Sequence, residues 1–143
     1  MNKTSISMMV VGGVFAAALT VTVGAQATRS TNEGVYTAEQ ATKGDAVYKE
    51  NCAACHGDNL EGSGPMPPLA GKDFLANWQG KTVGDLFEKT STTMPATAPG
   101  SLTPEQAADI ISFLLSKDAY PAGSAALEAK TEPLLKIKID APK

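Results

Sequence analysis

The run Cys52-Ala53-Ala54-Cys55-His56 constrains this chain more than any other feature of its sequence. Two thiols three positions apart lie on one turn of a helix, where each can add to a vinyl group of a porphyrin, and the adjacent imidazole can then bind the iron. The 143-residue chain has two cysteines and one histidine, and this motif uses all three. The spacing therefore predicts a covalently attached haem c, with Cys52 and Cys55 as thioether residues and His56 as an axial ligand.

Other uses of the motif fit the sequence less well. A thioredoxin-like Cys-x-x-Cys pair needs a βαβ context and no histidine after it. A structural zinc site needs four Cys or His ligands, and only three are present. A disulfide between residues three apart would be strained and would cross-link almost no chain. A small disulfide-bearing interaction module stays open as an alternative, and such a module would show no haem absorbance.

The first 27 residues have the pattern of a secretory signal. Lys3 supplies the positive start, residues 8–23 form an apolar stretch, and Ala25-Gln26-Ala27 is a small-x-small site, so we expect cleavage after Ala27. The alternative is a retained membrane anchor, although the apolar stretch is shorter than the roughly 20 residues that a spanning helix needs. We therefore expect a periplasmic protein, with membrane contact only if this segment is uncleaved.

The charge balance argues against nucleic acid as a partner. The chain carries 12 basic and 15 acidic residues, a net charge of −3, and Lys3 is the one charged residue before position 28. Cleavage would therefore leave 11 basic and 15 acidic residues, a net charge of −4. Nucleic-acid binding favours a basic stripe, whereas a mildly acidic surface suits a protein partner with a basic docking patch.

Capping signals and apolar periodicity predict a mainly helical fold. Three threonines each precede an apolar helical pattern: Thr37, Thr82 and Thr103. They predict helices over 38–51, 82–91 and 104–117, and a shorter helix is expected over 73–79. The sequence divides into a signal peptide over 1–27, a loose lead-in over 28–36, a haem-binding domain over 37–117 and a C-terminal extension over 118–143. The extension is expected to be a surface tail that ends in a short strand or an extended docking segment.

Methionine is the natural second axial ligand, because the chain has no second histidine. A thioether stabilises ferrous over ferric iron, so a His/Met pair raises the reduction potential. Removal of the signal would leave Met66 and Met94. Met66 lies ten residues after His56, in the loop expected to support the histidine, whereas Met94 lies 38 residues after it in a proline-bounded loop. Chain geometry therefore favours Met94, with ordinary core packing as its alternative role.

Three further features bear on the pocket. A ligating imidazole usually donates its other ring N–H to a carbonyl, and the loop over 65–68 is expected to supply one. Trp78 can donate its indole N–H to a haem propionate, with a place in the core as the alternative. The main functional alternative is a haem enzyme or gas-binding protein with an open sixth coordination site. Residues 91–103 contain no histidine or arginine that could activate a bound ligand.

The chain resembles class I cytochromes c by more than its haem motif. The family order of helix, Cys-x-x-Cys-His, Gly/Pro loop, short helices, Met-Pro loop and final helix runs through residues 36–117. The resemblance implies an all-α fold whose helices pack around one covalently bound haem. It also implies that Met94 is the distal ligand, that Pro67 accepts the His56 ring N–H, and that Trp78 contacts the cofactor.

The resemblance extends to helix packing and to partners. It implies that the first and last helices meet where Gly44 and Tyr48 face Ile110 and Phe113, since glycine lets two backbones approach. Three stretches resemble bacterial cytochromes linked to quinoprotein or other periplasmic dehydrogenases: Asn77-Trp78-Gln79-Gly80, Thr92-Thr93-Met94-Pro95 and Pro99-Gly100-Ser101-Leu102-Thr103-Pro104. The implied function is a monohaem electron carrier, not an enzyme, with a dehydrogenase as donor and a respiratory oxidase or another cytochrome as acceptor.

Overall fold

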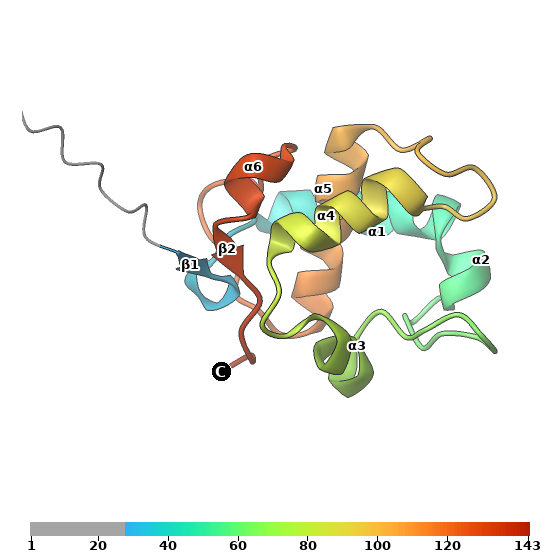
Figure 1. Cartoon of the computed structure of the whole chain (residues 1–143), viewed down its shortest axis with the longest axis horizontal. Coiled ribbons are helices and arrows are strands. Elements are labelled where there is room, and N and C mark those ends of the chain that lie inside the picture. The colour runs from blue at the N-terminus through green and yellow to red at the C-terminus, as the bar shows by residue number, and fades with distance from the viewer. Residues whose placement is uncertain (1–27) are drawn as a thin grey trace, which may run out of the picture.

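The computed structural model describes residues 28–143, and the predicted signal peptide lies outside the described residues (Figure 1). The elements in chain order are β1 (Arg29–Ser30), the 3-10 helix η1 (Thr31–Glu33), α1 (Ala38–Asn51), α2 (Ala53–His56), α3 (Gly71–Trp78), α4 (Val83–Thr93), α5 (Pro104–Lys117), α6 (Thr131–Leu134) and β2 (Ile137–Lys138). The mainly helical prediction is confirmed. Within the described residues, no helix is both long and apolar enough to span a bilayer.

The three threonine caps lie where the sequence predicts them. The Thr37 hydroxyl accepts a hydrogen bond from the Gln40 backbone N–H at 3.2 Å, and α4 and α5 each begin with a complete capping box. The helix α4 ends at Thr93, two residues beyond its predicted end. Each hydroxyl of Thr90–Thr93 donates to a carbonyl three or four residues earlier, so these side chains bond back to their own helix.

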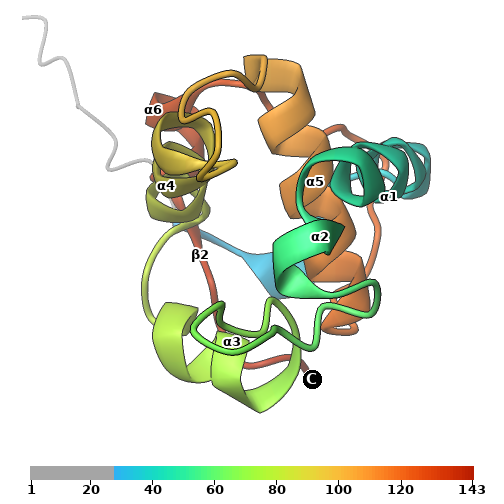
Figure 2. The ribbon, with the colours of Figure 1, turned by 90° about the vertical axis from the view of Figure 1, so that its right-hand side faces the viewer.

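The first and last long helices, α1 and α5, pack against each other at Gly44 (Figures 1 and 2). A Cβ atom at Gly44 would overlap the Asp109 carbonyl and lie 2.9 Å from Phe113 Cβ, so only glycine allows this approach. One turn later the ring centroids of Tyr48 and Phe113 are 5.3 Å apart. The expected small–aromatic contact is present. It fixes the position of the C-terminal end of α1, which leads directly into the haem motif.

The lead-in and the tail are packed together, so the predictions of a loose lead-in and a surface tail are wrong. Strands β1 and β2 pair in parallel, with Arg29 opposite Ile137. Six apolar residues of these two segments are at most 3% exposed: Val35, Tyr36, Tyr120, Leu127, Leu134 and Ile139. Their irregular spacing follows neither a helical nor a strand period, so pattern analysis does not predict their burial. The prediction of a short strand within 134–139 is confirmed by β2.

Hydrogen bonds connect the C-terminal extension to α1 and to the lead-in. The Gln40 amide donates to the Leu127 carbonyl at 3.0 Å and accepts from the Leu127 N–H at 2.7 Å. The side chain is therefore used for a long-range contact rather than to complete a capping box on α1. Nearby, the Tyr36 hydroxyl donates to the Tyr120 carbonyl at 2.7 Å. These bonds satisfy buried backbone groups that an extended segment otherwise leaves unpaired.

A buried carboxylate joins the end of α5 to the start of α3. Asp118 is 6% exposed, and its Oδ1 accepts from the Gly71 N–H at 2.6 Å. Its Oδ2 has no hydrogen-bond partner among the described residues. Burial raises the pKa of the Asp118 carboxyl above its ordinary value, and the Gly71 bond partly opposes that rise. This contact fixes where α3, the helix that carries Trp78, begins.

Candidate haem site

The two cysteines lie on one helical turn that follows directly from α1. The Cys52 N–H bonds to the Tyr48 carbonyl at 2.8 Å, and the His56 N–H bonds to the Cys52 carbonyl at 2.9 Å. Cys52 is half-buried and Cys55 is exposed, and neither forms a disulfide. Burial, and next the proximity of Cys55, raise the pKa of Cys52 to about 11. Both side chains project from a single turn, which is the arrangement that two thioether bonds to one porphyrin require.

His56 ends α2 and is 7% exposed. Its Nδ1 lies 2.9 Å from the Pro67 carbonyl oxygen. A carbonyl can only accept, so Nδ1 carries the proton and the lone pair is on Nε2, where it can bind a metal. The Tyr48 hydroxyl donates to the Gly57 carbonyl at 2.7 Å and holds the residue after His56 against α1. The tautomer and the backbone position of the imidazole are therefore both fixed by the protein.

The loop that carries Pro67 is folded tightly on itself. The Gly62 N–H bonds to the His56 carbonyl at 2.8 Å, and Ser63 and Met66 form a small antiparallel bridge. Gly62 has a φ of +76°, and a Cβ there would lie 2.6 Å from the Met66 carbonyl oxygen. The positive φ and the close approach both require glycine. The loop thus presents the Pro67 carbonyl to His56 from a rigid frame.

The other predicted site residues lie at the ends of α3 and α4. Trp78 is the last residue of α3, is half-buried, and has its ring centroid 6.4 Å from that of Phe74. Met94 directly follows α4 and is half-buried, and its N–H bonds to the Thr90 carbonyl at 3.2 Å. Met94 is thus held by its backbone at the start of an uncharged loop.

A cavity of about 420 Å³ lies between the Pro67 loop, α3 and α4. Its lining consists of Pro67, Pro68, Leu69, Asn77, Trp78, Lys81 and Lys89. Figure 2, which looks onto the end that carries α2, shows α2, α3, α4 and α5 arranged around the centre of the view. The size is in the range of cofactor pockets, about 300–1,000 Å³. Of the predicted site residues, Pro67 and Trp78 line this cavity. Two thiols on one turn, an imidazole of fixed tautomer and a neighbouring wall that contains Trp78 and two prolines together fit a c-type haem.

Lys81 and Lys89 are the lining residues that sequence reasoning missed. Both are exposed, and Lys81 lies in the turn before α4 while Lys89 lies on the polar side of that helix. Exposed lysines at such positions are typical of a solvated face. The sequence contains no signal that separates these two from the other lysines.

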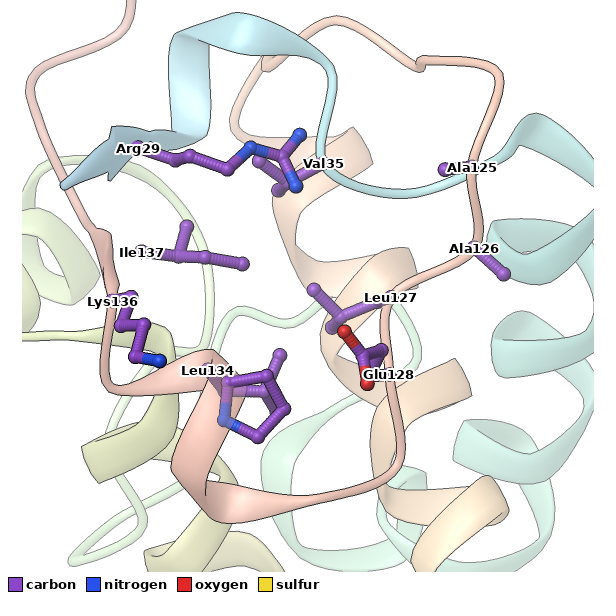
Figure 3. A pocket seen from close by; sticks show the side chains of 10 residues that line it. Arg29, Val35, Ala125, Ala126, Leu127, Glu128, Leu134, Lys136 and Ile137 are labelled. Carbon is purple, nitrogen blue, oxygen red and sulfur yellow. The ribbon is translucent and has the colours of Figure 1, made fainter. Parts of the chain in front are cut away.

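A second cavity, of about 430 Å³, lies between the lead-in and the tail (Figure 3). Val35, Leu127 and Ile137 contribute apolar side chains, with Arg29 and Glu128 also in its lining. In Figure 1 this region, marked by β1 and β2, is at the opposite end of the molecule from α2. None of the predicted site residues lines it.

Comparisons with known proteins identify the family of this chain. Residues 39–114 match the family model described as "Cytochrome C oxidase, cbb3-type, subunit III". The chain is 51% identical over 52 residues to the Cbb3-type cytochrome c oxidase subunit CcoP of Azospirillum brasilense, a match that covers 32% of this chain and 18% of that protein. It is 32% identical over 77 residues to cytochrome c6 of Diacronema lutheri, which covers 52% of this chain and 92% of that protein.

A solved structure shows the same fold. The sulfane dehydrogenase SoxCD from Paracoccus pantotrophus aligns with a TM-score of 0.52 and 24% identity, over 88% of this chain and 66% of that one. The fold and the site define a class I monohaem cytochrome c. The chain belongs to the cbb3-type cytochrome c family matched over residues 39–114, so its cofactor is covalently bound haem c and it carries electrons.

Proposed function

We propose that this chain is an exported electron carrier in which Cys52 and Cys55 hold the haem and His56 and Met94 bind its iron. The observation that carries the proposal is the buried His56 ring, whose Nδ1 is bonded to the Pro67 carbonyl at 2.9 Å. This bond leaves Nε2 free for the metal and removes the alternative in which His56 is a solvated loop residue.

The position of Met66 supports Met94 as the distal ligand. Met66 precedes Pro67, whose carbonyl lies on the Nδ1 side of the imidazole. That side points away from an iron bound at Nε2, so Met66 belongs to the frame behind the histidine. Its backbone is also held in the bridge with Ser63. Met94 instead comes from the end of α4, a different element, and can approach the opposite face.

The protein residues then keep one geometry in both oxidation states. Bound haem supplies a one-electron Fe(II)/Fe(III) couple. Pro67 fixes the imidazole, the back-bonded end of α4 positions Met94, and neither contact needs to change when an electron arrives. Cys55 is exposed, so the edge of the haem bonded to it would lie at the protein surface, where a redox partner can approach. A soft thioether at Met94 favours the ferrous state and so raises the potential.

Location and partners follow from the N-terminal pattern and the relatives. We propose cleavage after Ala27 and a periplasmic mature chain over 28–143, with the haem held by residues 37–117 and residues 118–143 as a packed extension. The CcoP relative is named as an oxidase subunit, although the match spans 18% of its length. We therefore propose a respiratory acceptor such as an oxidase or another cytochrome, and a periplasmic dehydrogenase as donor.

The test uses the haem-loaded protein and two matched variants. Spectra of the oxidised and reduced protein, with and without carbon monoxide, are expected to show low-spin haem that does not bind the gas. Met94→Ala is expected to bind carbon monoxide and to have a lower reduction potential, because a coordination position opens and the thioether is lost. Met66→Ala removes the same side chain from the supporting loop and is expected to do neither.

Two outcomes would contradict the proposal. Ready carbon monoxide binding by the unaltered protein would indicate an open site, as in a haem enzyme or gas sensor. Gas binding by Met66→Ala but not by Met94→Ala would reverse the ligand assignment. The attachment residues are tested separately: the double variant Cys52→Ala, Cys55→Ala is expected to retain no haem on a denaturing gel stained for haem.

A further inference from the structure

The cavity between the Pro67 loop, α3 and α4 carries two positive charges that the proposed axial ligands do not explain. Among the described residues, its lining includes Lys81 and Lys89 and no acidic residue. Neither lysine belongs to an ion pair of the described region, whose pairs lie on α1 and beside β2. Two lysines without a carboxylate in ion-pair contact, in a lining that also holds prolines, a leucine and a tryptophan, favour a ligand with an apolar body and an anionic edge.

Lys81 is held at the wall of the cavity. Its Nζ lies 4.8 Å from the centroid of the Trp78 ring, a cation–π distance. The neighbouring carboxylate that interacts with Lys81 is Asp85, and Asp85 Oδ2 already accepts from the Thr82 N–H at 2.8 Å and the Thr82 hydroxyl at 2.7 Å. Asp85 serves as the cap of α4 and forms no ion pair with Lys81 among the described residues, so Lys81 has no carboxylate in contact.

Lys89 approaches the same space from a different element. It lies on α4, two turns after the capping box, and it shares the lining with Pro67 and Pro68 of the loop that supports His56. The cavity therefore extends from the loop behind the histidine to the helix that leads to Met94. A haem held by His56 beside the Pro67 loop would border this cavity, whose lining contains both lysines.

We propose that Lys81 and Lys89 hold the haem propionates, with the indole N–H of Trp78 and the amide of Asn77 as neutral donors beside them. This assignment rests on the proposed haem site and adds residues that position the cofactor. Two ammonium groups stabilise ionised propionates and so lower the pKa of those carboxyl groups. They also offset the negative charge near the iron, which favours the ferrous state.

The experiment compares haem-loaded Lys81→Gln, Lys89→Gln and the double variant with Lys130→Gln, which removes an exposed lysine outside the cavity. The reduction potential is measured from pH 5 to pH 9 by spectroelectrochemical titration. In the unaltered protein the potential falls with pH as the propionates ionise. In the double variant we expect the potential to fall at a pH roughly one unit higher than in the unaltered protein. At pH 9 we expect the potential of the double variant to be lower than that of the unaltered protein. Lys130→Gln is expected to follow the unaltered protein.

Each result is decisive for the lysines. If the Lys81 and Lys89 variants match Lys130→Gln at every pH, the propionate assignment is wrong. The same holds if only the salt dependence of electron exchange with a partner protein changes, since the lysines would then serve docking. Failure of the Met94 assignment is distinguishable, because the carbon monoxide spectra report the sixth ligand while the pH profile reports the propionates.

Discussion

Replacement of Gly44 by alanine tests whether the contact between α1 and α5 is as close as the structure shows. Two effects of this substitution oppose each other. Alanine favours a helix over glycine by about 1 kcal/mol, which alone would stabilise the protein. The new Cβ, however, would overlap the Asp109 carbonyl and lie 2.9 Å from Phe113 Cβ.

The steric effect is expected to be the larger one. Carbon atoms in contact are normally about 3.5–4.0 Å apart, so α1 and α5 would have to separate by roughly 1 Å. Overpacking typically costs about 1–3 kcal/mol, and more where backbone must move. The obstacle at Gly44 includes the Asp109 backbone, which cannot change rotamer. We expect a net loss of about 2 kcal/mol, or a fall in Tm of about 8 °C for a domain of this size.

The assay is thermal unfolding of the haem-loaded protein, followed by circular dichroism at 222 nm. Glu50→Ala, at an exposed position of the same helix, serves as the control and is expected to change stability by at most about 0.5 kcal/mol. A Gly44→Ala variant as stable as the unaltered protein, or more stable, would refute the inference, because helix propensity would then outweigh the contact.

Three further predictions concern contacts outside the haem. Gln40→Ala is expected to destabilise the protein by about 2–4 kcal/mol in urea unfolding and to speed amide exchange at Leu127, because both backbone groups of Leu127 lose a buried partner. Gln40→Met keeps the length of the side chain without its hydrogen bonds, so it is expected to speed the same exchange, and a Gln40→Met variant as stable as the unaltered protein would contradict the assigned role. The raised pKa of Asp118 means that ionisation of this carboxyl disfavours the folded state. The stability that the protonated carboxyl contributes is complete below the ordinary pKa of 3.8 and is lost as the pH rises through the raised pKa. Asp118→Asn is expected to gain stability relative to the unaltered protein from pH 4 to pH 7, and a stability difference that does not change with pH would refute this. Burial raises the pKa of Tyr48 from 10.0 to about 12. The free energy of unfolding is therefore expected to fall as the pH rises from 10 to 12, because the unfolded chain loses the Tyr48 proton first. Denaturant unfolding at pH 9 and 11.5 is expected to show this fall in the unaltered protein and not in Tyr48→Phe.

The helices could be predicted because their signals are local. Thr37, Thr82 and Thr103 each bond to a residue three positions later, so both partners stand in one short stretch of sequence. The haem motif is equally local, since all of its chemistry lies within five residues. The position of Pro67 behind His56 came from the family resemblance, and the contact at 2.9 Å agrees with it.

The packing of the two ends could not be predicted from such signals. Leu127 is buried because Gln40, 87 positions away, holds its backbone. The lead-in is ordered because β1 finds its partner in β2, near the other end of the chain. Lys81 and Lys89 were missed for the same reason: each is an ordinary exposed lysine until the Pro67 loop is folded opposite it. Long-range partners, rather than the residues themselves, determine these features.

The pairing of β1 with β2 also fixes how the molecule could be attached to something else. Asn32 donates to the Ala141 carbonyl at 2.8 Å, so the two extremities of the described chain meet at one pole. The turn that bears Cys55 lies at the other pole (Figure 1). If the protein were immobilised on an electrode, or fused to another protein, through either end of the described chain, the pole that bears Cys55 would still face the solution. Dissolved redox partners could then reach it.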